Sequence, residues 1–295
     1  MSMNEKEGLI LSGKNGLYTV EAENGTYVCR SGTRVRKNDG KILAGDKVLF
    51  RDNGDGNGFI ISMLERKNSL VRPPVANIDL LAMVVAPKDP APYLYNIDLL
   101  TVIAEKNDIE SAIIISKSDL GDHAEIVDIY RKTPFRVIIT SSESGSGIDE
   151  ARALLSNKIC VLCGASGVGK STLLNSLYPE LKLQTGSLSE KIARGKNTTR
   201  TTELFPMGNG TYLADTPGFT AVNTELYCAI DHKELHKLFP EFEKHTHNCR
   251  YSDCTHTKET ECGIFEAVSN GEIALSRHES YKKLYGELKS IDRYK

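Results

Sequence analysis

The chain has 295 residues, 40% of them hydrophobic, and a formal net charge of −2 at pH 7. This length favours about two or three domains, and a charge so near zero gives by itself no argument for a nucleic-acid partner. Because no stretch approaches the roughly 20 apolar residues of a membrane span, and the first residues lack the apolar core of a signal peptide, we expect a cytoplasmic protein that binds no membrane.

Residues 1–68 predict a small antiparallel β-barrel, most simply an OB-fold. Short apolar runs, several of them alternating with a period of two, are separated by glycine-containing turns at fairly even spacing. The runs are 16–20, 25–30, 45–50 and 58–61. The basic segment 30–37 is the kind of loop through which such barrels meet nucleic acid, so we expect RNA binding here. A barrel that only caps its neighbour, without a ligand, is the alternative.

Residues 69–225 predict an α/β domain that begins near Arg72-Pro73-Pro74. Apolar runs at 80–85, 112–115, 137–139 and 159–163 have the length of buried strands. They alternate with helical patterns at 94–107, 122–132 and 148–157. Strands and helices that alternate in this way form a mostly parallel sheet covered by helices.

A phosphate-binding loop is predicted directly after the run 159–163. Gly164, four intervening residues and Gly169-Lys170-Ser171 match the P-loop pattern, between a predicted strand and a predicted helix. Glycines let backbone N–H groups converge on phosphate oxygens, and the helix N-terminus adds the positive end of its dipole. We expect Lys170 to reach the β- and γ-phosphates and Ser171 to bind Mg²⁺. The nucleotide-binding residues predicted in this loop are Gly164, Ala165, Ser166, Gly167, Val168, Gly169, Lys170, Ser171 and Thr172.

Two further segments are expected to act at the γ-phosphate. A predicted strand ends at Asp215, whose carboxylate can hold Mg²⁺ through water, and the N–H of Gly218 can sense a γ-phosphate. In the polar segment 195–200, a threonine can bind Mg²⁺ only when the γ-phosphate is present, and Thr199 is preferred over Thr198. The predicted catalytic residues are Lys170, Thr199, Asp215 and Gly218, and the predicted magnesium ligands are Ser171, Thr199 and Asp215.

A guanine-reading segment is predicted after the run 112–115. The carboxylate of Asp119 can accept hydrogen bonds from N1 and N2 of guanine, which adenine cannot offer, while the stem of Lys117 can cover one face of the base. The four-residue string alone is a weak motif, but a serine pair at the next strand end resembles a second base-contacting loop. The predicted base-binding residues are Ser116, Lys117, Ser118, Asp119, Ser141 and Ser142.

The order of these motifs along the chain is unusual. The base-reading segment precedes the P-loop, whereas it follows the P-loop in an ordinary GTPase. A circular permutation preserves the spatial site and moves only the chain ends. The domain 69–225 is therefore predicted to be a circularly permuted P-loop GTPase that binds GTP and GDP.

Residues 226–295 predict a polar, mainly helical module that contains a metal site. Cys249, Cys254, His256 and Cys262 offer three thiolates and one imidazole, with His245 and His247 as alternative ligands. Such a donor count suits a closed, tetrahedral, structural zinc. Zinc binding would organise a module too polar to fold around a core of its own.

Together these features resemble the RsgA (YjeQ) family of circularly permuted GTPases, which act in maturation of the small ribosomal subunit. The resemblance spans the barrel, the Gly164–Thr172 loop, the segment 215–219 and the Cys/His cluster. It implies three domains (1–68, 69–225 and 226–295), one zinc per chain held by Cys249, Cys254, His256 and Cys262, and Mg²⁺ with GTP. The implied partners are the 30S subunit and its 16S rRNA, and a monomer is the simplest expectation.

The chain departs from the family pattern at a few positions. Ser116 stands where relatives usually carry Asn or Thr, so we expect a weaker tie between the base segment and the P-loop. Asn197 replaces a histidine in the segment 195–200, and Phe219 occupies the position where many small GTPases have a catalytic glutamine. These residues predict slow intrinsic hydrolysis, and Gly167 argues against a potassium-dependent mechanism because such enzymes typically have Asn there.

We expect an enzyme that binds the subunit in its GTP state, hydrolyses GTP faster on the subunit and leaves afterwards. The alternative is an RNA-binding assembly scaffold with a weakly active nucleotide pocket, which the replacements at Ser116, Asn197 and Phe219 favour. A P-loop enzyme that uses ATP on another substrate is a third reading, which Asp119 argues against.

Overall fold

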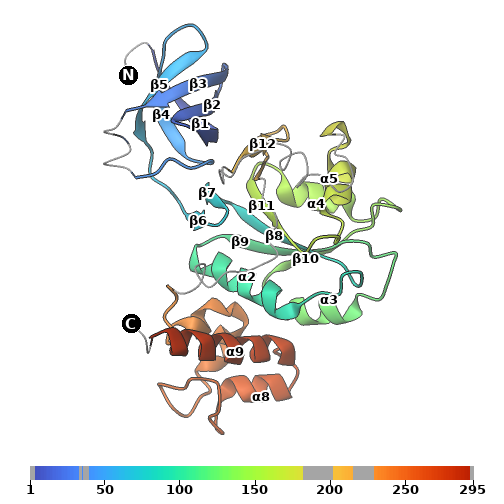
Figure 1. Ribbon diagram of the computed structural model, residues 1–295. Coiled ribbons are helices and arrows are strands. Elements are labelled where there is room, and N and C mark those ends of the chain that lie inside the picture. The colour runs from blue at the N-terminus through green and yellow to red at the C-terminus, as the bar shows by residue number, and fades with distance from the viewer. Residues whose placement is uncertain (1–3, 33–34, 36–39, 182–201, 215–228, 293–295) are drawn as a thin grey trace. The chain divides into compact units, whose positions relative to one another are not determined.

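The computed structural model describes residues 4–32, 35, 40–181, 202–214 and 229–292 (Figure 1). The chain divides into two compact units. The first consists of Met1–Leu81, Arg152–Leu162 and Leu183–Pro217, and the second of Ala82–Ala151, Cys163–Lys182 and Gly218–Lys295. None of the helices within the described ranges is long and apolar enough to cross a lipid bilayer.

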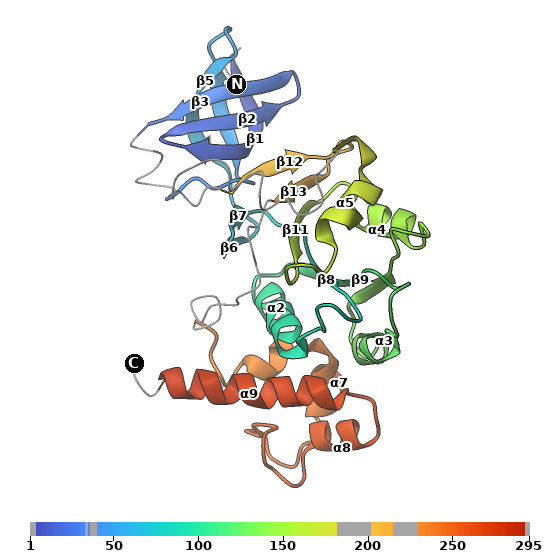
Figure 2. The ribbon, with the colours of Figure 1, turned by 45° about the vertical axis from the view of Figure 1, so that its right-hand side comes forward.

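The N-terminal strands close into a five-stranded barrel, which confirms the predicted OB-type fold (Figure 2). The strands are β1 (Glu5–Lys14), β2 (Leu17–Ala22), β3 (Gly25–Ser31), β4 (Lys47–Asp52) and β5 (Asn57–Met63). Their order is β1-β2-β3-β5-β4, with β4 paired back to β1 and β3 parallel to β5. Inward side chains fill the barrel, among them Ile10, Val20, Cys29, Phe50 and Ile60. Closure of the sheet leaves no free edge.

Strand β1 is not among the four predicted runs. Its register with β2 shifts between Ile10 and Ser12, and Ile10 and Leu11 are both buried. Such an irregularity breaks the period of two on which strand prediction depends. The hairpin of β6 (Ser69–Val71) and β7 (Pro74–Ala76), whose turn contains Arg72-Pro73, also escaped prediction because three-residue strands show no periodicity.

The central sheet has six strands in the order β10-β9-β8-β11-β13-β12. They are β8 (Leu80–Val85), β9 (Glu110–Ile115), β10 (Arg136–Ile139), β11 (Ile159–Cys163), β12 (Leu204–Pro206) and β13 (Tyr212–Ala214). The pairs β9–β10 and β11–β13 are parallel, while β12 adds an antiparallel edge that the sequence did not predict. Helices α2 (Leu94–Lys106), α3 (Ala124–Tyr130), α4 (Ile148–Leu155) and α5 (Lys170–Leu177) alternate with the strands, as predicted.

The strand order brings the predicted motifs together. The base segment follows β9 and the P-loop follows β11, and these two strands lie on either side of β8. All six residues of β8 are buried, as expected for a strand covered on both faces. Ser116 and Gly164 are 48 residues apart in the sequence, but only β8 separates the strands that precede them.

The C-terminal part of the second unit is helical, with α7 (Glu243–Thr246), α8 (Gly263–Ser269) and α9 (Leu275–Asp292). Two turns of 3-10 helix, Leu235–Leu238 and Pro240–Phe242, precede α7. The rings of Phe239 and Phe242 each pack against Tyr281 of α9, with centroids 5.3 Å and 5.1 Å away. This aromatic cluster gives the segment a small hydrophobic core, so the prediction that the segment is too polar for a core of its own was wrong.

Helix α2 is buried on all sides in its middle. Every residue from Ile97 to Ala104 is buried. Helix α9 lies against α2 in both ribbon views (Figures 1 and 2), and Arg277 of α9 donates hydrogen bonds to Asp98 (2.9 Å) and Thr101 (3.0 Å) of α2. The buried polar side chains of α2, Asp98 and Thr101, thus share a cationic partner in Arg277.

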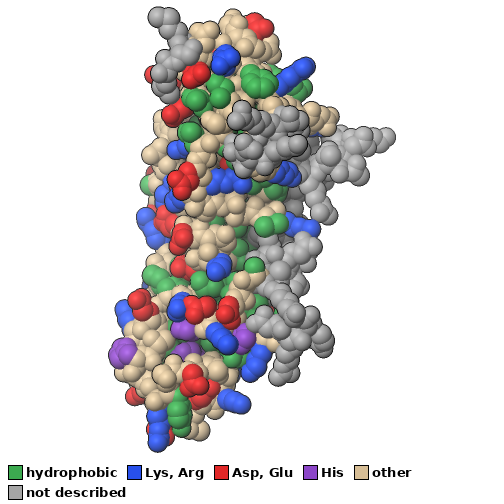
Figure 3. Space-filling model, turned by 90° about the vertical axis from the view of Figure 1, so that its left-hand side faces the viewer, with side chains coloured by type: hydrophobic (Ala, Val, Ile, Leu, Met, Phe, Trp, Pro, Cys, Tyr) green, Lys and Arg blue, Asp and Glu red, His purple; other side chains and the backbone are tan. Residues whose placement is uncertain are grey.

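Acidic and basic side chains are interspersed over the face shown in Figure 3, without one large area of a single sign. The mixture agrees with the formal net charge of −2. A contact with nucleic acid on this face would depend on a few well-placed residues.

Candidate nucleotide-binding and metal sites

The predicted P-loop connects the end of β11 to the start of α5. Gly164 has φ +150°, and a Cβ at this residue would lie 2.3 Å from the carbonyl oxygen of Val84. Gly169 precedes the first helical residue with φ +91°. Both positions require glycine, because a side chain would clash at the first and strain the backbone at the second. The loop therefore has the exposed backbone that phosphate binding needs.

Lys170 lies at the first position of α5 and folds back over the loop. Its ammonium group donates hydrogen bonds to the carbonyls of Gly164 (2.7 Å) and Ala165 (2.8 Å). Burial lowers the pKa of Lys170 below its usual value. An anion in the loop would offer this cation stronger acceptors than two neutral carbonyls. Ser171 follows, half-buried in the first turn of the helix, and Thr172 is exposed.

Ser116 and Lys117 join the base segment to the P-loop. The buried hydroxyl of Ser116 lies 2.5 Å from the carbonyl oxygen of Val168 and 3.0 Å from that of Val85. Lys117 Nζ donates a hydrogen bond of 2.6 Å to the carbonyl of Gly167. Hydrogen bonds thus connect the two segments even with serine at position 116. That this connection is weaker than in relatives stays a prediction.

Asp119 and Ser141 connect the two predicted base-binding loops. The hydroxyl of Ser141 donates a hydrogen bond of 2.5 Å to Asp119 Oδ1, and the N–H of Ser118 donates one of 3.1 Å to the carbonyl of Thr140. An open pocket lies beside these groups. Its lining residues are Ser116, Lys117, Asp119, Ser142, Glu143, Gly169, Thr172, Asn175 and Ser176.

Three residues of this pocket were not predicted from the sequence: Glu143, Asn175 and Ser176. Glu143 directly follows the predicted pair Ser141-Ser142, so its position in the sequence could have indicated that it lies at the pocket. Asn175 and Ser176 lie on α5 more than one turn after Lys170 and belong to no motif. Only the packing of α5 against the base segment reveals them.

Several predicted site residues lie outside the described part of the chain. They are Thr198, Thr199, Asn197, Asp215, Gly218 and Phe219. Half of the basic segment 30–37 (residues 33, 34, 36 and 37) and Cys228 also lie outside it. The described cysteines outside the Cys/His cluster, Cys29, Cys160 and Cys163, are buried.

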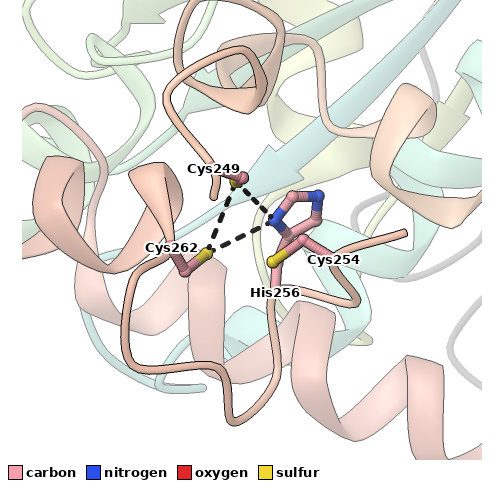
Figure 4. Close-up of side chains that lie close together, drawn as sticks. All are labelled: Cys249, Cys254, His256 and Cys262. Atoms are coloured by element: carbon pink, nitrogen blue, oxygen red, sulfur yellow. Dashed lines mark hydrogen bonds between the residues drawn. The ribbon is translucent and has the colours of Figure 1, made fainter. Parts of the chain in front are cut away.

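The second candidate site is the cluster of Cys249, Cys254, His256 and Cys262 (Figure 4). One potential ligand atom from each residue lies within 4.8 Å of all the others. The Nδ1 atom of His256 lies 3.5 Å from the sulfur of Cys249 and 3.4 Å from that of Cys262, and these sulfurs are 3.9 Å apart. Zinc bonds of about 2.3 Å to sulfur and 2.0 Å to nitrogen would separate tetrahedral ligands by about 3.5–3.8 Å. The cluster could therefore hold such an ion.

The surroundings of the cluster orient its side chains. The N–H of Gly263 lies 3.3 Å from the sulfur of Cys249, and His278 Nε2 donates a hydrogen bond of 2.8 Å to the carbonyl of His256. Burial lowers the pKa of His256 to about 4, which keeps the imidazole neutral, the form that a metal requires. The alternative ligand His245 lies near Glu272 instead, 3.8 Å away.

Glu259 holds the loop between the ligands. Its carboxylate accepts hydrogen bonds from the N–H groups of Thr255, Thr257 and Lys258, and from the hydroxyl of Thr255. Burial alone would raise the pKa of Glu259, but the hydrogen bonds, led by that of the Thr255 side chain, lower it to about 2. No motif in the sequence pointed to this residue.

Comparison with known proteins gives the family of the chain. The sequence model of the RsgA GTPase matches residues 63–225, and that of the RsgA N-terminal domain matches residues 7–60. The chain belongs to the RsgA family of GTPases. The small ribosomal subunit biogenesis GTPase RsgA of Caldanaerobacter subterraneus is 39% identical over 99% of this chain and 100% of its own length. The protein of the same name from Thermotoga neapolitana is 40% identical over 96% and 97%.

Solved structures of the family have the same fold. The crystal structure of YjeQ from Thermotoga maritima superposes with a TM-score of 0.82 at 38% identity, over 96% of this chain and 98% of that one. YloQ, described as a circularly permuted GTPase, gives a TM-score of 0.78 at 28% identity, over 98% and 96%. The RsgA fold thus includes the permuted motif order of this chain, as the sequence predicted.

Proposed function

We propose that this RsgA-family GTPase acts in late maturation of the 30S ribosomal subunit. In this proposal the protein binds the subunit and its 16S rRNA in the GTP state, hydrolyses GTP faster there and leaves afterwards. The proposal that the chain binds GTP rests on one observation. Ser116 and Lys117 of the base segment donate hydrogen bonds to carbonyls of the P-loop. The names of full-length relatives support the ribosomal part.

We infer that Asp119 selects guanine. Its second carboxylate oxygen and the pocket beside it suit a base that offers two N–H donors, while Ser141 orients the first oxygen. A site built around such a pairing discriminates strongly against a base that lacks it. Lys117, whose stem passes close to Gly169, would cover one face of the base.

The proposed reaction is in-line attack of water on the γ-phosphate. The P-loop N–H groups would bind the phosphates, and Lys170 would exchange its present carbonyl partners for the β- and γ-phosphate oxygens. Ser171, Thr199 and Asp215 supply oxygen donors, which suit Mg²⁺, and the bound ion would neutralise phosphate charge. Gly218 would contact the γ-phosphate through its N–H.

We infer that Cys249, Cys254, His256 and Cys262 hold one structural zinc ion per chain. Four protein donors complete a tetrahedral shell and leave no open position for catalysis. The barrel and the C-terminal helices would each contact rRNA. The protein would act as a monomer in the cytoplasm.

The proposed function is tested by phosphate release from GTP and from ATP, with and without purified 30S subunits. We expect slow release from GTP alone, a sharp rise with subunits and none from ATP. Lys170→Ala should abolish the release, because it removes the cation that stabilises the transferred charge. Release that is equal with and without subunits would contradict the proposal, and maturation supported by Lys170→Ala would favour the RNA-binding scaffold.

A further inference from the structure

An exposed aromatic side chain lies between two arginines on the outer face of the barrel. Phe59 of β5 keeps 46% of its surface exposed. In the register of the sheet its direct neighbours are Arg30 of β3 and Arg51 of β4. Directly paired residues project from the same face with Cβ atoms about 5 Å apart. Phe59 therefore has an arginine next to it on each neighbouring strand.

Both arginines can reach a ligand. Arg30 is exposed and makes no ion pair with any residue in the described ranges. Arg51 keeps 59% of its side chain exposed, and its nearest carboxylate, that of Glu5, is 3.7 Å away. A contact of this length at the surface contributes little energy, so a phosphate can replace it.

The apolar surface extends from Phe59 across the next strands. Val28 is 46% exposed and lies diagonal to Phe59, while Leu17 is 43% exposed and pairs with Arg30. Three large apolar side chains this exposed on one barrel face indicate a binding surface, since single exposed residues are normally scattered.

We propose that this face, centred on Phe59 with Arg30 and Arg51, binds unpaired nucleotides of RNA. A base stacks on the phenyl ring, and the flanking phosphates pair with the two guanidinium groups. The flanking positive charges favour a polyanion over an apolar protein segment. Duplex RNA satisfies the arginines but hides its base faces, so it cannot use the ring. The choice of RNA rests on the proposed ribosomal function.

The test uses the absence of tryptophan from this protein. A Phe59→Trp variant of the full chain carries one tryptophan, on the proposed surface. We expect a short single-stranded RNA to quench its fluorescence saturably, because stacking brings the indole against a base. The matched control is Val71→Trp, at a residue 68% exposed in the β6–β7 hairpin, whose fluorescence should not change.

Two further measurements complete the test. Phe59→Ala should weaken binding of the same RNA by about 5- to 100-fold, the range expected for loss of one base stack. An RNA duplex of the same length should not quench Phe59→Trp. Unchanged fluorescence of Phe59→Trp, equal quenching of both tryptophan variants, or unchanged RNA affinity of Phe59→Ala would each overturn the proposal. Subunit-stimulated GTP hydrolysis is read separately, so its failure does not affect this result.

Discussion

At the scale of single residues, Ser141 controls the orientation of the proposed base reader. Its hydroxyl is the group that connects Asp119 to the loop after β10, at 2.5 Å. Ser146 lies in the same loop but is exposed, and only its backbone takes part in the turn. The two serines therefore offer a matched pair for mutation.

Ser141→Ala should raise the Kd for GTP by about 5- to 10-fold, because the carboxylate loses one hydrogen bond worth about 1 kcal/mol. Ser146→Ala should leave the Kd unchanged. Isothermal titration calorimetry with both variants makes the comparison. Equal affinities of the two variants would mean that Asp119 does not depend on Ser141.

Glu259 has a comparable role in the metal loop. Glu259→Ala leaves three backbone N–H groups without their acceptor, and should lower the free energy of unfolding by about 1–3 kcal/mol. The control is Glu261→Ala, which removes only an exposed ion pair with Arg250 and should cost little. Urea unfolding followed by circular dichroism measures both, and a similar loss in the two variants would count against the anchoring role.

At the scale of elements, a buried cation fixes α9 against α2. Arg277 is fully buried and donates hydrogen bonds to Asp98, and to Glu241 at 2.7 Å and 3.2 Å. Burial alone would lower the pKa of Arg277, but the carboxylates of Glu241 and Asp98 raise it above its ordinary value. Tyr130 of α3 adds a hydrogen bond of 2.9 Å to Asp98. Helix α9, helix α2 and the 3-10 turn Pro240–Phe242 thus meet at one guanidinium group, and α3 joins them through Asp98.

Arg277→Met should destabilise the protein by about 3–5 kcal/mol, because it leaves two buried carboxylates without a counter-charge. Lys237→Met, which breaks an exposed pair with Glu234 within one turn, should change stability by less than about 1 kcal/mol. The free energy of unfolding in urea distinguishes them. If both variants unfold at the same urea concentration, the network does not hold these helices together.

At the scale of the whole molecule, removal of the metal should affect one part of the chain selectively. Stripping zinc with a chelator should increase hydrogen exchange in α8, which starts directly after Cys262, and leave β3 of the barrel protected. The reason is that metal binding supplies folding energy only to the segment that provides its ligands. Mass spectrometry of exchanged peptides reads both regions, and added zinc should restore protection. Uniform loss of protection, or none, would contradict a local structural role.

Much of the architecture could be predicted because its signals are local. The alternation of apolar residues predicted four barrel strands, and the strand run 159–163 coincides with β11 (Ile159–Cys163). The helix predicted at 94–107 is α2 (Leu94–Lys106). The irregular strand β1 and the short strand β12 were missed because neither has enough regular residues for a period to show. Domain limits at 68 and 225 stay predictions.

By itself the sequence determined the family, the permuted order of the motifs and the presence of a Cys/His cluster, because each depends on residues close together in the chain. Only the tertiary structure decided which distant groups meet. Examples are Ser116 with Val168, Asp98 with Arg277, and Phe59 between two arginines. Such contacts depend on strand order, register and helix packing. Hydrophobic periodicity indicates which face of an element is buried, but it does not encode what that face, or the opposite one, will contact.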